Sequence, residues 1–378
     1  MTSDRGIINS FGAFEAYYKN EPLRGRSSSS ISWIGTFQGF LLLFFGIVGG
    51  PLFDKGWYRL LISGGALLTV FGMMMTSLST QYYELFLAQG VCVGLGTAVL
   101  FLPSVALTAQ YFSTKRALAT GIVASGGSVG AVIYTIIFRK LQPRIGFGWT
   151  TRIIGFIALA CLAVSFCLMH SRQSSSGAVR KIVDLSAFKS TPFLVCISGF
   201  FLSFVGLYVP FFHIITYAQS HSHVNEDMSF YLLSIMNAGS VIGRIIPGAV
   251  ADRVGSVRVM TICIFASAIL MYAWIAIDSL ASLVVFSVLY GCLSGAVVSL
   301  PPTMVASLVP GIQQIGTWMG MAFCFSGLGL LVGNPIAGTL ISVQNDDFVR
   351  MIVFGASCTM AAGVIFGVLD WLEQQPHN

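Results

Sequence analysis

Long apolar segments separated by short polar breaks run from one end of the chain to the other. Eleven of them reach or exceed the ~20 residues that an α-helix needs to cross the hydrocarbon layer of a bilayer. A membrane β-barrel would show ~10-residue segments of alternating polarity instead, so the pattern predicts transmembrane helices. The predicted helices are residues 31–53, 58–78, 83–111, 117–138, 149–170, 192–217, 229–251, 257–277, 280–308, 316–341 and 348–372.

The apolar segment before these helices is shorter. Residues 6–18 would reach only about 20 Å as a helix, which is short of a bilayer. No small-x-small cleavage site precedes the polar stretch 19–30, so a partial or shortened first helix is a better interpretation than a signal peptide. We therefore expect eleven complete helices and a partial first one.

The longest polar stretch after the N-terminal region lies at the middle of the chain, at residues 171–191. It leaves six segments on each side if the partial helix is included. We therefore predict an all-α polytopic membrane protein of two six-helix bundles. The expected parts are an N-terminal bundle at residues 1–170, a central linker at 171–191, a C-terminal bundle at 192–372 and a short tail at 373–378.

Composition excludes several classes of protein. Hydrophobic residues make up 55% of the chain and charged residues 9%, which is too few charges to cover a soluble fold. The net charge of +6 is scattered over short loops, so we expect no nucleic-acid partner. All eight cysteines fall inside apolar segments without metal-ligand spacing, and we expect no metal and no cofactor. A membrane-embedded enzyme would need clustered His, Asp, Glu or Cys, and the sequence contains no such group.

A charged turn occurs once in each predicted bundle. The glycine, the aspartate and the basic residue directly after the aspartate each lie 198 residues apart in the two copies (248 − 50 = 198). A further arginine stands one position closer to the aspartate in the first copy than in the second. A repeat at this spacing indicates two homologous halves. These charges lie at helix ends, where a solvated loop face is the simple alternative to a functional role. They are Asp54, Lys55 and Arg59 in the first copy and Asp252, Arg253 and Arg258 in the second.

Arg244 lies deep inside an otherwise apolar segment. A guanidinium at membrane depth costs at least ~2.5 kcal/mol, and such residues usually face a cavity or a partner. Its planar fork can hold a carboxylate, so anion recognition is the functional interpretation. A structural arginine that binds helix carbonyls is the alternative. The equivalent place in the first half is Gly46 (244 − 198 = 46), and this asymmetry favours a role in substrate binding.

Other polar and aromatic residues in the middle of predicted helices are candidates for lining a central cavity. For each of them, interhelical hydrogen bonding or aromatic packing is the alternative. Together with Arg244, the set that we assign to the substrate is Asn9, Tyr208, His213, Asn237 and Tyr290.

Titratable groups inside the spans are scarce. His213 is the histidine well inside a span that could titrate near neutral pH. The carboxylates Glu15 and Glu84 lie near helix ends, so a proton-driven mechanism has no obvious carboxylate carrier. Facilitated diffusion, or coupling through His213 or through an acid group of the substrate, stays open.

Six plus six helices, with an acidic-basic glycine turn after the second helix of each half, resemble the major facilitator superfamily. Residues 94–130 resemble the fourth and fifth helices of its monocarboxylate transporter family, especially the fungal branch, through Pro103, Tyr111-Phe112, Lys115-Arg116 and the glycine cluster at 125–130. Residues 9–18, 50–59 and 319–338 resemble the same group. The resemblance implies that both termini and the central linker at 171–191 are cytoplasmic, and that the halves rock about a midplane site. It also implies that the charged turns form conformational latches, pairing across the bundles when the cytoplasmic side is closed.

Three departures from these relatives limit what the resemblance implies. The acidic, glycine- and tryptophan-rich signature that opens the first helix is absent, together with the lysine of animal members. Ser240 stands where animal proton-coupled members have an aspartate, one turn before the arginine. Gln89 stands where related drug-proton antiporters have an arginine. Proton-linked lactate transport and the coupling residues of the antiporters therefore do not transfer to this chain.

We expect a secondary transporter of small organic anions or amphipathic metabolites. The resemblance implies monocarboxylates or related metabolites, and fungal relatives extend this class to vitamins and exported secondary metabolites. A non-transporting sensor or receptor on the same fold, or an inactive truncated transporter, is the alternative. We expect a monomer in the lipid bilayer of the plasma membrane, with a vacuolar or other internal membrane as the alternative. Protons stay open as a second partner.

Overall fold

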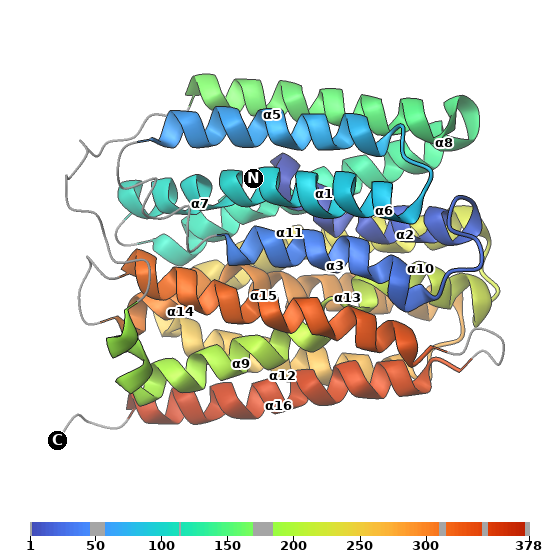
Figure 1. Ribbon diagram of the computed structural model, residues 1–378. Helices are drawn as coiled ribbons and strands as arrows, with labels where there is room; N and C mark the ends of the chain where they lie inside the picture. The colour runs from blue at the N-terminus through green and yellow to red at the C-terminus, as the bar shows by residue number, and fades with distance from the viewer. Residues whose placement is uncertain are drawn as a thin grey trace.

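Helices that run back and forth along one common direction make up the computed structural model (Figure 1). It describes residues 2–45, 57–112, 115–168, 184–309, 315–341 and 347–374. Within these ranges, nine helices are long and apolar enough to cross a membrane. The predicted all-α polytopic fold is thereby confirmed.

The N-terminal bundle contains the helices up to residue 168. The chain reverses direction inside the last of them at Gly146, whose φ of 78° favours glycine. This long element therefore contains the two helices predicted at residues 117–138 and 149–170. The elements are α1 (Thr2–Asn9), α2 (Phe11–Asn20), α3 (Ser28–Phe44), α5 (Tyr58–Thr76), α6 (Tyr82–Leu85), the π-helical η1 (Phe86–Val93), α7 (Gly94–Tyr111) and α8 (Arg116–Leu168).

The C-terminal bundle follows a short 3-10 helix, η2 (Leu185–Lys189), which lies at the end of the predicted linker. Residues 171–183 of that linker lie outside the described ranges. The helices of this bundle are α9 (Thr191–Leu207), α10 (Val209–Ser220), α11 (Glu226–Val254), α12 (Ser256–Trp274), α13 (Leu280–Ser299), α14 (Pro301–Leu308), α15 (Ile315–Thr339) and α16 (Val349–Gln374).

The helix array has two ends, a linker end and a distal end. The linker end is where α8 begins at Arg116 and α11 ends at Val254. The distal end is where α2 ends at Asn20 and α11 begins at Glu226. In Figure 1 the linker end lies at the left and the distal end at the right. The two bundles meet along two main seams, where α8 packs against α11 and α3 packs against α15.

Three segments that were predicted as single helices are interrupted. The segment 192–217 breaks at Tyr208, because Pro210 lacks an N–H group and its ring clashes with the preceding turn. The segment 280–308 breaks at Leu300, just before Pro301 and Pro302. The N-terminal segment breaks at Ser10 without a proline, and the hydroxyl of Ser10 donates to the Ile7 carbonyl at 2.9 Å.

Glycines allow close helix contacts inside the C-terminal bundle. A Cβ atom at Gly291 would lie 2.0 Å from the carbonyl oxygen of Met236, and one at Gly333 would lie 2.2 Å from that of Val205. Such contacts are possible only without a side chain, and they replace the hydrophobic effect, which is lacking between helices in lipid. The glycines therefore fix how α13 approaches α11 and how α15 approaches α9.

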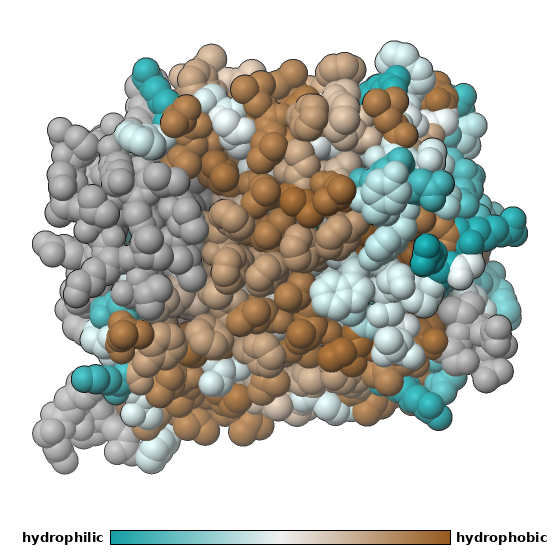
Figure 2. All heavy atoms as spheres, viewed as in Figure 1, coloured by the Kyte–Doolittle hydropathy of each residue, from teal (hydrophilic) through white to brown (hydrophobic). Residues whose placement is uncertain are grey.

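The outer surface matches a bilayer. Figure 2 shows apolar side chains covering the middle of one face, with hydrophilic side chains gathered toward the distal end. Exposed large hydrophobic residues such as Leu67, Phe71 and Ile269 belong to helices on the outside of the bundles. In water these side chains would be unfavourably exposed, whereas lipid solvates them. The protein is an integral, multi-pass membrane protein.

Candidate functional site

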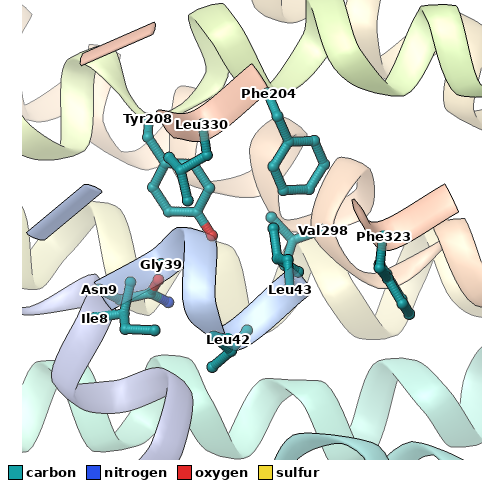
Figure 3. Close-up of a pocket in the computed structure, with 10 residues that line it drawn as sticks. All are labelled: Ile8, Asn9, Gly39, Leu42, Leu43, Phe204, Tyr208, Val298, Phe323 and Leu330. Carbon is teal, nitrogen blue, oxygen red and sulfur yellow. The ribbon is translucent and has the colours of Figure 1, made fainter. Parts of the chain in front are cut away.

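A cavity lies between the two bundles, at the level where two helices are interrupted. Ile8 and Asn9 reach it from the end of α1, and Tyr208 reaches it from the break between α9 and α10. Figure 3 shows the ten lining residues gathered around this space. In this conformation it is narrow and partly open to the outside, with room for little more than a water molecule. The lining residues are Ile8, Asn9, Gly39, Leu42, Leu43, Phe204, Tyr208, Val298, Phe323 and Leu330.

The lining of this cavity is apolar and aromatic apart from two residues. Asn9 and Tyr208 are 4% and 8% exposed, and each brings a polar group to the cavity. In Figure 3 the Tyr208 hydroxyl points toward the side of the cavity that carries Asn9. The ten lining residues include no charged side chain. The cavity therefore offers apolar contact and a few hydrogen bonds, the usual make-up of a small-molecule site, but no counter-ion for a carboxylate.

Arg244 lies on α11 and joins the two bundles in this conformation. Its guanidinium is 1% exposed and donates from Nη1 to the carbonyl oxygen of Ala124 on α8. Its Nε donates to Oγ of Ser240 at 3.2 Å, and that hydroxyl accepts from Ser128 of α8 at 3.1 Å. Arg244 is not among the residues that line the described cavity. This is the carbonyl-bound arrangement that the sequence allowed as the alternative to anion binding.

Two other residues assigned to the substrate make contacts with the backbone. Asn237 donates from Nδ2 to the carbonyl oxygen of Leu233 at 3.0 Å and to that of Asn9, in the other bundle, at 3.4 Å. The structure places Tyr290 inside the C-terminal bundle instead of on the cavity. Its hydroxyl donates to the Leu207 carbonyl at 2.8 Å, because a buried phenol needs an acceptor and the break after α9 provides one.

His213 lies on α10, one and a half turns from Tyr208, and is not among the lining residues. Its ring faces Glu15 of α2, with 3.8 Å between His213 Nδ1 and Glu15 Oε1. Both side chains are buried. Glu15 therefore lies inside the protein between the bundles, and its place near the end of a predicted helix gave no sign of this partner.

At the linker end, Asp252 of α11 caps the first turn of α8. Its two carboxylate oxygens accept from the backbone N–H groups of Ala117 and Leu118, both at 3.0 Å. These N–H groups have no acceptor within their own helix and form the positive end of the helix dipole. The Asp252 carboxylate therefore holds the C-terminal bundle against the N-terminal bundle.

We expect Asp252→Asn to weaken closure of the linker end. The amide offers one acceptor oxygen without the negative charge that the helix dipole favours, so the cap should lose about 0.3–1 kcal/mol. Spin labels on genetically encoded amino acids at Lys115 and Val254, both exposed, measure the opening as a shift toward longer distances. Asp278→Asn is the matched control, because Asp278 pairs with His221 inside one bundle. An unchanged distance distribution in Asp252→Asn would contradict the role of the cap.

The other charges of the two turns lie in different surroundings. Arg258 pairs with Asp370 of α16, with 3.5 Å between Nε and Oδ2, inside the C-terminal bundle and not across the bundles. Arg253 is exposed in the last turn of α11, and Arg59 is exposed in the first turn of α5. Two further charges of the expected latch, Asp54 and Lys55, lie outside the described residues.

The distal end carries a second contact between the bundles, which sequence reasoning missed. Arg139 of α8 donates from Nη1 to Glu226 and from Nε to Asp227, both at 2.7 Å. Its guanidinium carbon also lies 5.1 Å from the ring centroid of Phe230. Both acids stand in the first turn of α11, behind the N-cap Asn225. The bundles are therefore joined at both ends in this conformation, with the cavity between them.

The family model of the Major Facilitator Superfamily matches residues 7–247 and 223–377. The chain belongs to the major facilitator superfamily. Among solved structures, that of the nucleoside transporter NupG superposes on this member of the superfamily with a TM-score of 0.75 at 15% identity, covering 97% of each chain. This likeness shows the major facilitator fold.

Curated fungal members of the superfamily are similar over most of this chain. The MFS-type transporter dbaD of Emericella nidulans is 38% identical over 95% of this chain and 81% of its own length. The aspyridones efflux protein apdF of the same organism is 38% identical over 95% of this chain and 73% of its own length. The agnestins efflux protein AgnL12 of Paecilomyces divaricatus is 38% identical over 89% and 77%. These relatives support a transporter, as predicted, and not an enzyme.

Proposed function

We propose that the protein is a secondary transporter that exports a small, largely apolar organic metabolite by alternating access. The observation that carries this proposal is the cavity between the bundles, whose polar groups come from Asn9 and Tyr208 alone among its ten lining residues. The relatives named for the efflux of aspyridones and agnestins support export as the direction.

The chemistry of the lining favours a neutral or amphipathic substrate over a monocarboxylate. A carboxylate brought into this cavity would lose its hydration without gaining a cationic partner from the lining residues, which is strongly unfavourable. We retain the monocarboxylate transporter-like branch as the proposed subfamily, on the resemblance of residues 94–130. Within that branch we propose the metabolite exporters, and not the lactate carriers, as the functional relatives.

The contacts at the two ends support alternating access. Asp252 joins the bundles at the linker end, and Arg139 joins them at the distal end. A transporter must break one set of contacts at a time, so that the cavity opens to one side and then to the other. We place the linker end in the cytoplasm and the protein in the plasma membrane, where export from the cell would occur.

Binding and flux of a compound panel test this function. The purified protein is incubated with neutral aromatic and polycyclic compounds and with short monocarboxylates, and ligand-induced changes in unfolding temperature are measured. Compounds that bind are then loaded into proteoliposomes to follow protein-dependent efflux. We expect neutral compounds to bind and move, and Asn9→Leu and Tyr208→Phe to weaken their binding. Tyr272→Phe is the control, because its hydroxyl contacts Ser357 at 2.8 Å in an exposed position. Binding without flux would identify a sensor, and flux of monocarboxylates alone would overturn the proposed substrate class.

The same panel decides the role of Arg244. We expect Arg244→Ala to reduce the flux of neutral and acidic compounds by the same factor, because its guanidinium donates to the Ala124 carbonyl across the bundles. Its loss then changes the conformational step and not the affinity for a charged group. A loss of binding confined to organic acids would instead assign Arg244 to the substrate anion, as its position in the sequence predicted.

A further inference from the structure

Two buried titratable side chains meet between the bundles, close to the cavity. Glu15 lies on α2 of the N-terminal bundle and is 3% exposed, and His213 lies on α10 of the C-terminal bundle and is 1% exposed. The distance between Glu15 Oε1 and His213 Nδ1 is 3.8 Å. The same oxygen accepts from the hydroxyl of Ser32 on α3 at 2.8 Å. Three helices from both bundles therefore converge on one carboxylate.

Each partner also has a polar atom without a hydrogen bond among the described residues. These atoms are Oε2 of Glu15 and Nε2 of His213. A buried polar atom that lacks a partner is costly, and the cost rises steeply if the group is charged and alone. The number of protons that this pair binds therefore depends on whether the two side chains are buried together or exposed to water.

The surroundings contain one further charged group that acts on both partners. Lys19, one turn beyond Glu15 on α2, influences each of them through its field, but no ion pair with Glu15 is present in the described structure. Tyr18 of α2 also donates its hydroxyl to Oε1 of Gln89 on η1, inside the N-terminal bundle, and the contacts of α2 with α8 and α11 include apolar ones. Phe14 packs on Phe138 of α8, with ring centroids 4.6 Å apart, and Leu233 of α11 lies against Gly12.

The pair is mechanically linked to the cavity. Glu15 follows the cavity residue Asn9 by six positions, and His213 follows Tyr208 by five. At the rise of an α-helix these separations are about 9 Å and about 8 Å toward the distal end. The contact between Glu15 and His213 therefore connects the two interrupted segments that bring polar groups to the cavity. It does so just beyond the cavity, on the distal side.

Counting protons shows what closure requires. Without a proton, the buried pair contains a lone carboxylate, and with two protons it contains a lone imidazolium. With one proton it is either a neutral pair or an ion pair, and both avoid an isolated buried charge. When the bundles separate at the distal end and the groups are hydrated, the carboxylate is ionised and the imidazole loses its proton near neutral pH.

We propose that Glu15 and His213 form a proton-binding site between the bundles, which takes up one proton from the distal side as that side closes. The proton comes from water, binds to a carboxylate oxygen or an imidazole nitrogen, and is returned when the bundles part there. This site rests on the proposed alternating access and adds a second ligand to it. A low pH on the distal side then favours closure of the distal end.

The sign of the pH effect follows from the proton count. At pH 8 the separated pair holds no proton and the closed pair holds one, so lowering the pH stabilises the closed state. At pH values well below neutrality both states hold one proton, and the effect levels off. The ratio of closed to open distal ends should therefore rise by up to about tenfold per pH unit between pH 8 and pH 6.

A measurement without substrate tests the site. Spin labels on genetically encoded amino acids at the exposed Ile145 and His223 report the distance across the distal end of the full-length protein in lipid nanodiscs. We expect the closed fraction of the parent to increase as the pH falls from 8 to 6. Glu15→Gln should abolish this increase or reverse it, because the remaining imidazole gains a proton at low pH in the open state and is costly to bury as a cation. His213→Gln should keep the increase and extend it below pH 6, because a buried carboxyl still takes up a proton as the distal end closes, while the hydrated carboxylate stays ionised. Lys19→Gln should leave it in place.

His221→Gln is the matched control, because His221 pairs with Asp278 inside one bundle at 3.2 Å and is partly exposed. A parent protein whose distance distribution is the same at pH 8 and pH 6 overturns the proposal. An increase in the closed fraction that persists in Glu15→Gln overturns it as well, and so does one that levels off at the same pH in His213→Gln as in the parent. An increase that vanishes in His221→Gln or Lys19→Gln also overturns it. Since no substrate is present, this result is separate from the flux result that tests the proposed function.

Discussion

Valine at Gly121 is expected to stop transport while the protein stays folded. Gly121 of α8 lies against α11, and a Cβ atom there would be 2.1 Å from the carbonyl oxygen of Arg244. This contact is between the bundles, so a side chain pushes them apart without disturbing the packing inside either one. Overpacking of this kind costs about 1–3 kcal/mol, which corresponds to a roughly 5- to 150-fold loss of the state with the linker end closed.

The matched variant is Gly243→Val, where the same change affects contacts inside a single bundle. A Cβ atom at Gly243 would be 1.8 Å from the carbonyl oxygen of Cys292 on α13. We expect Gly243→Val to lower the unfolding temperature and the yield of folded protein, whereas Gly121→Val lowers efflux from proteoliposomes and lengthens the distance between labels at Lys115 and Val254. Gly64→Val should change neither property, because a Cβ atom at Gly64 has no neighbour within 4 Å. Efflux at the parental rate in Gly121→Val would contradict the assignment of this contact to the transport cycle.

The helical architecture could be predicted because a bilayer sets the length of an apolar segment. Most of the expected helices have counterparts at nearly the same residues. Two of the three interruptions are caused by prolines, Pro210 and Pro301, which stand just after the break. The third, at Ser10, has no such signal. It depends on packing between α1, α2 and the opposite bundle, which a local pattern does not encode.

The candidate site was harder to predict, because its residues are brought together from distant parts of the chain. Asn9 and Tyr208 were expected at the substrate and line the cavity, but most of its lining consists of residues such as Leu42 and Phe323, which look like ordinary apolar side chains in the sequence. Tyr290 has the same pattern as Tyr208, yet it finds a backbone acceptor within its own bundle. Periodicity identifies the helix that carries a residue and not which of its neighbours that residue will face.

The partners of the charged residues between the bundles could not be predicted from local sequence patterns either. Glu15 was read as a carboxylate near a helix end, because its partner His213 lies 198 residues away. Arg139 follows the predicted helix 117–138 directly, beside Lys140 and Arg144, and nothing in that local pattern distinguishes it from an ordinary loop cation. The signal that could have identified its role was the pair Glu226 and Asp227 behind an N-cap residue at the same end of the facing helix. Only the pairing of α8 with α11 makes that connection.

Reversing the charge at Arg139 is expected to open the distal end. Arg139→Glu removes two charge-assisted hydrogen bonds of 2.7 Å and places a third carboxylate beside Glu226 and Asp227. Arg139 donates to two separate carboxylates and is itself only 14% exposed, so the contact should contribute about 1–2 kcal/mol, more than a fully exposed pair. Loss of the contact and repulsion together should shift the ratio of open to closed distal ends by at least roughly tenfold.

The test of this latch is rescue by the reciprocal charge. In Arg139→Glu combined with Glu226→Arg, the new arginine can pair with the glutamate at 139 and with Asp227, so the closed fraction measured between labels at Ile145 and His223 should recover. Efflux should recover with it, because export needs the distal end to close once in every cycle. Arg152→Glu is the control, since Arg152 contacts Ser77 at 3.1 Å inside the N-terminal bundle. A double variant as open as Arg139→Glu alone would mean that the single variant acts through local packing against Phe230 and not through the charges that hold the bundles together.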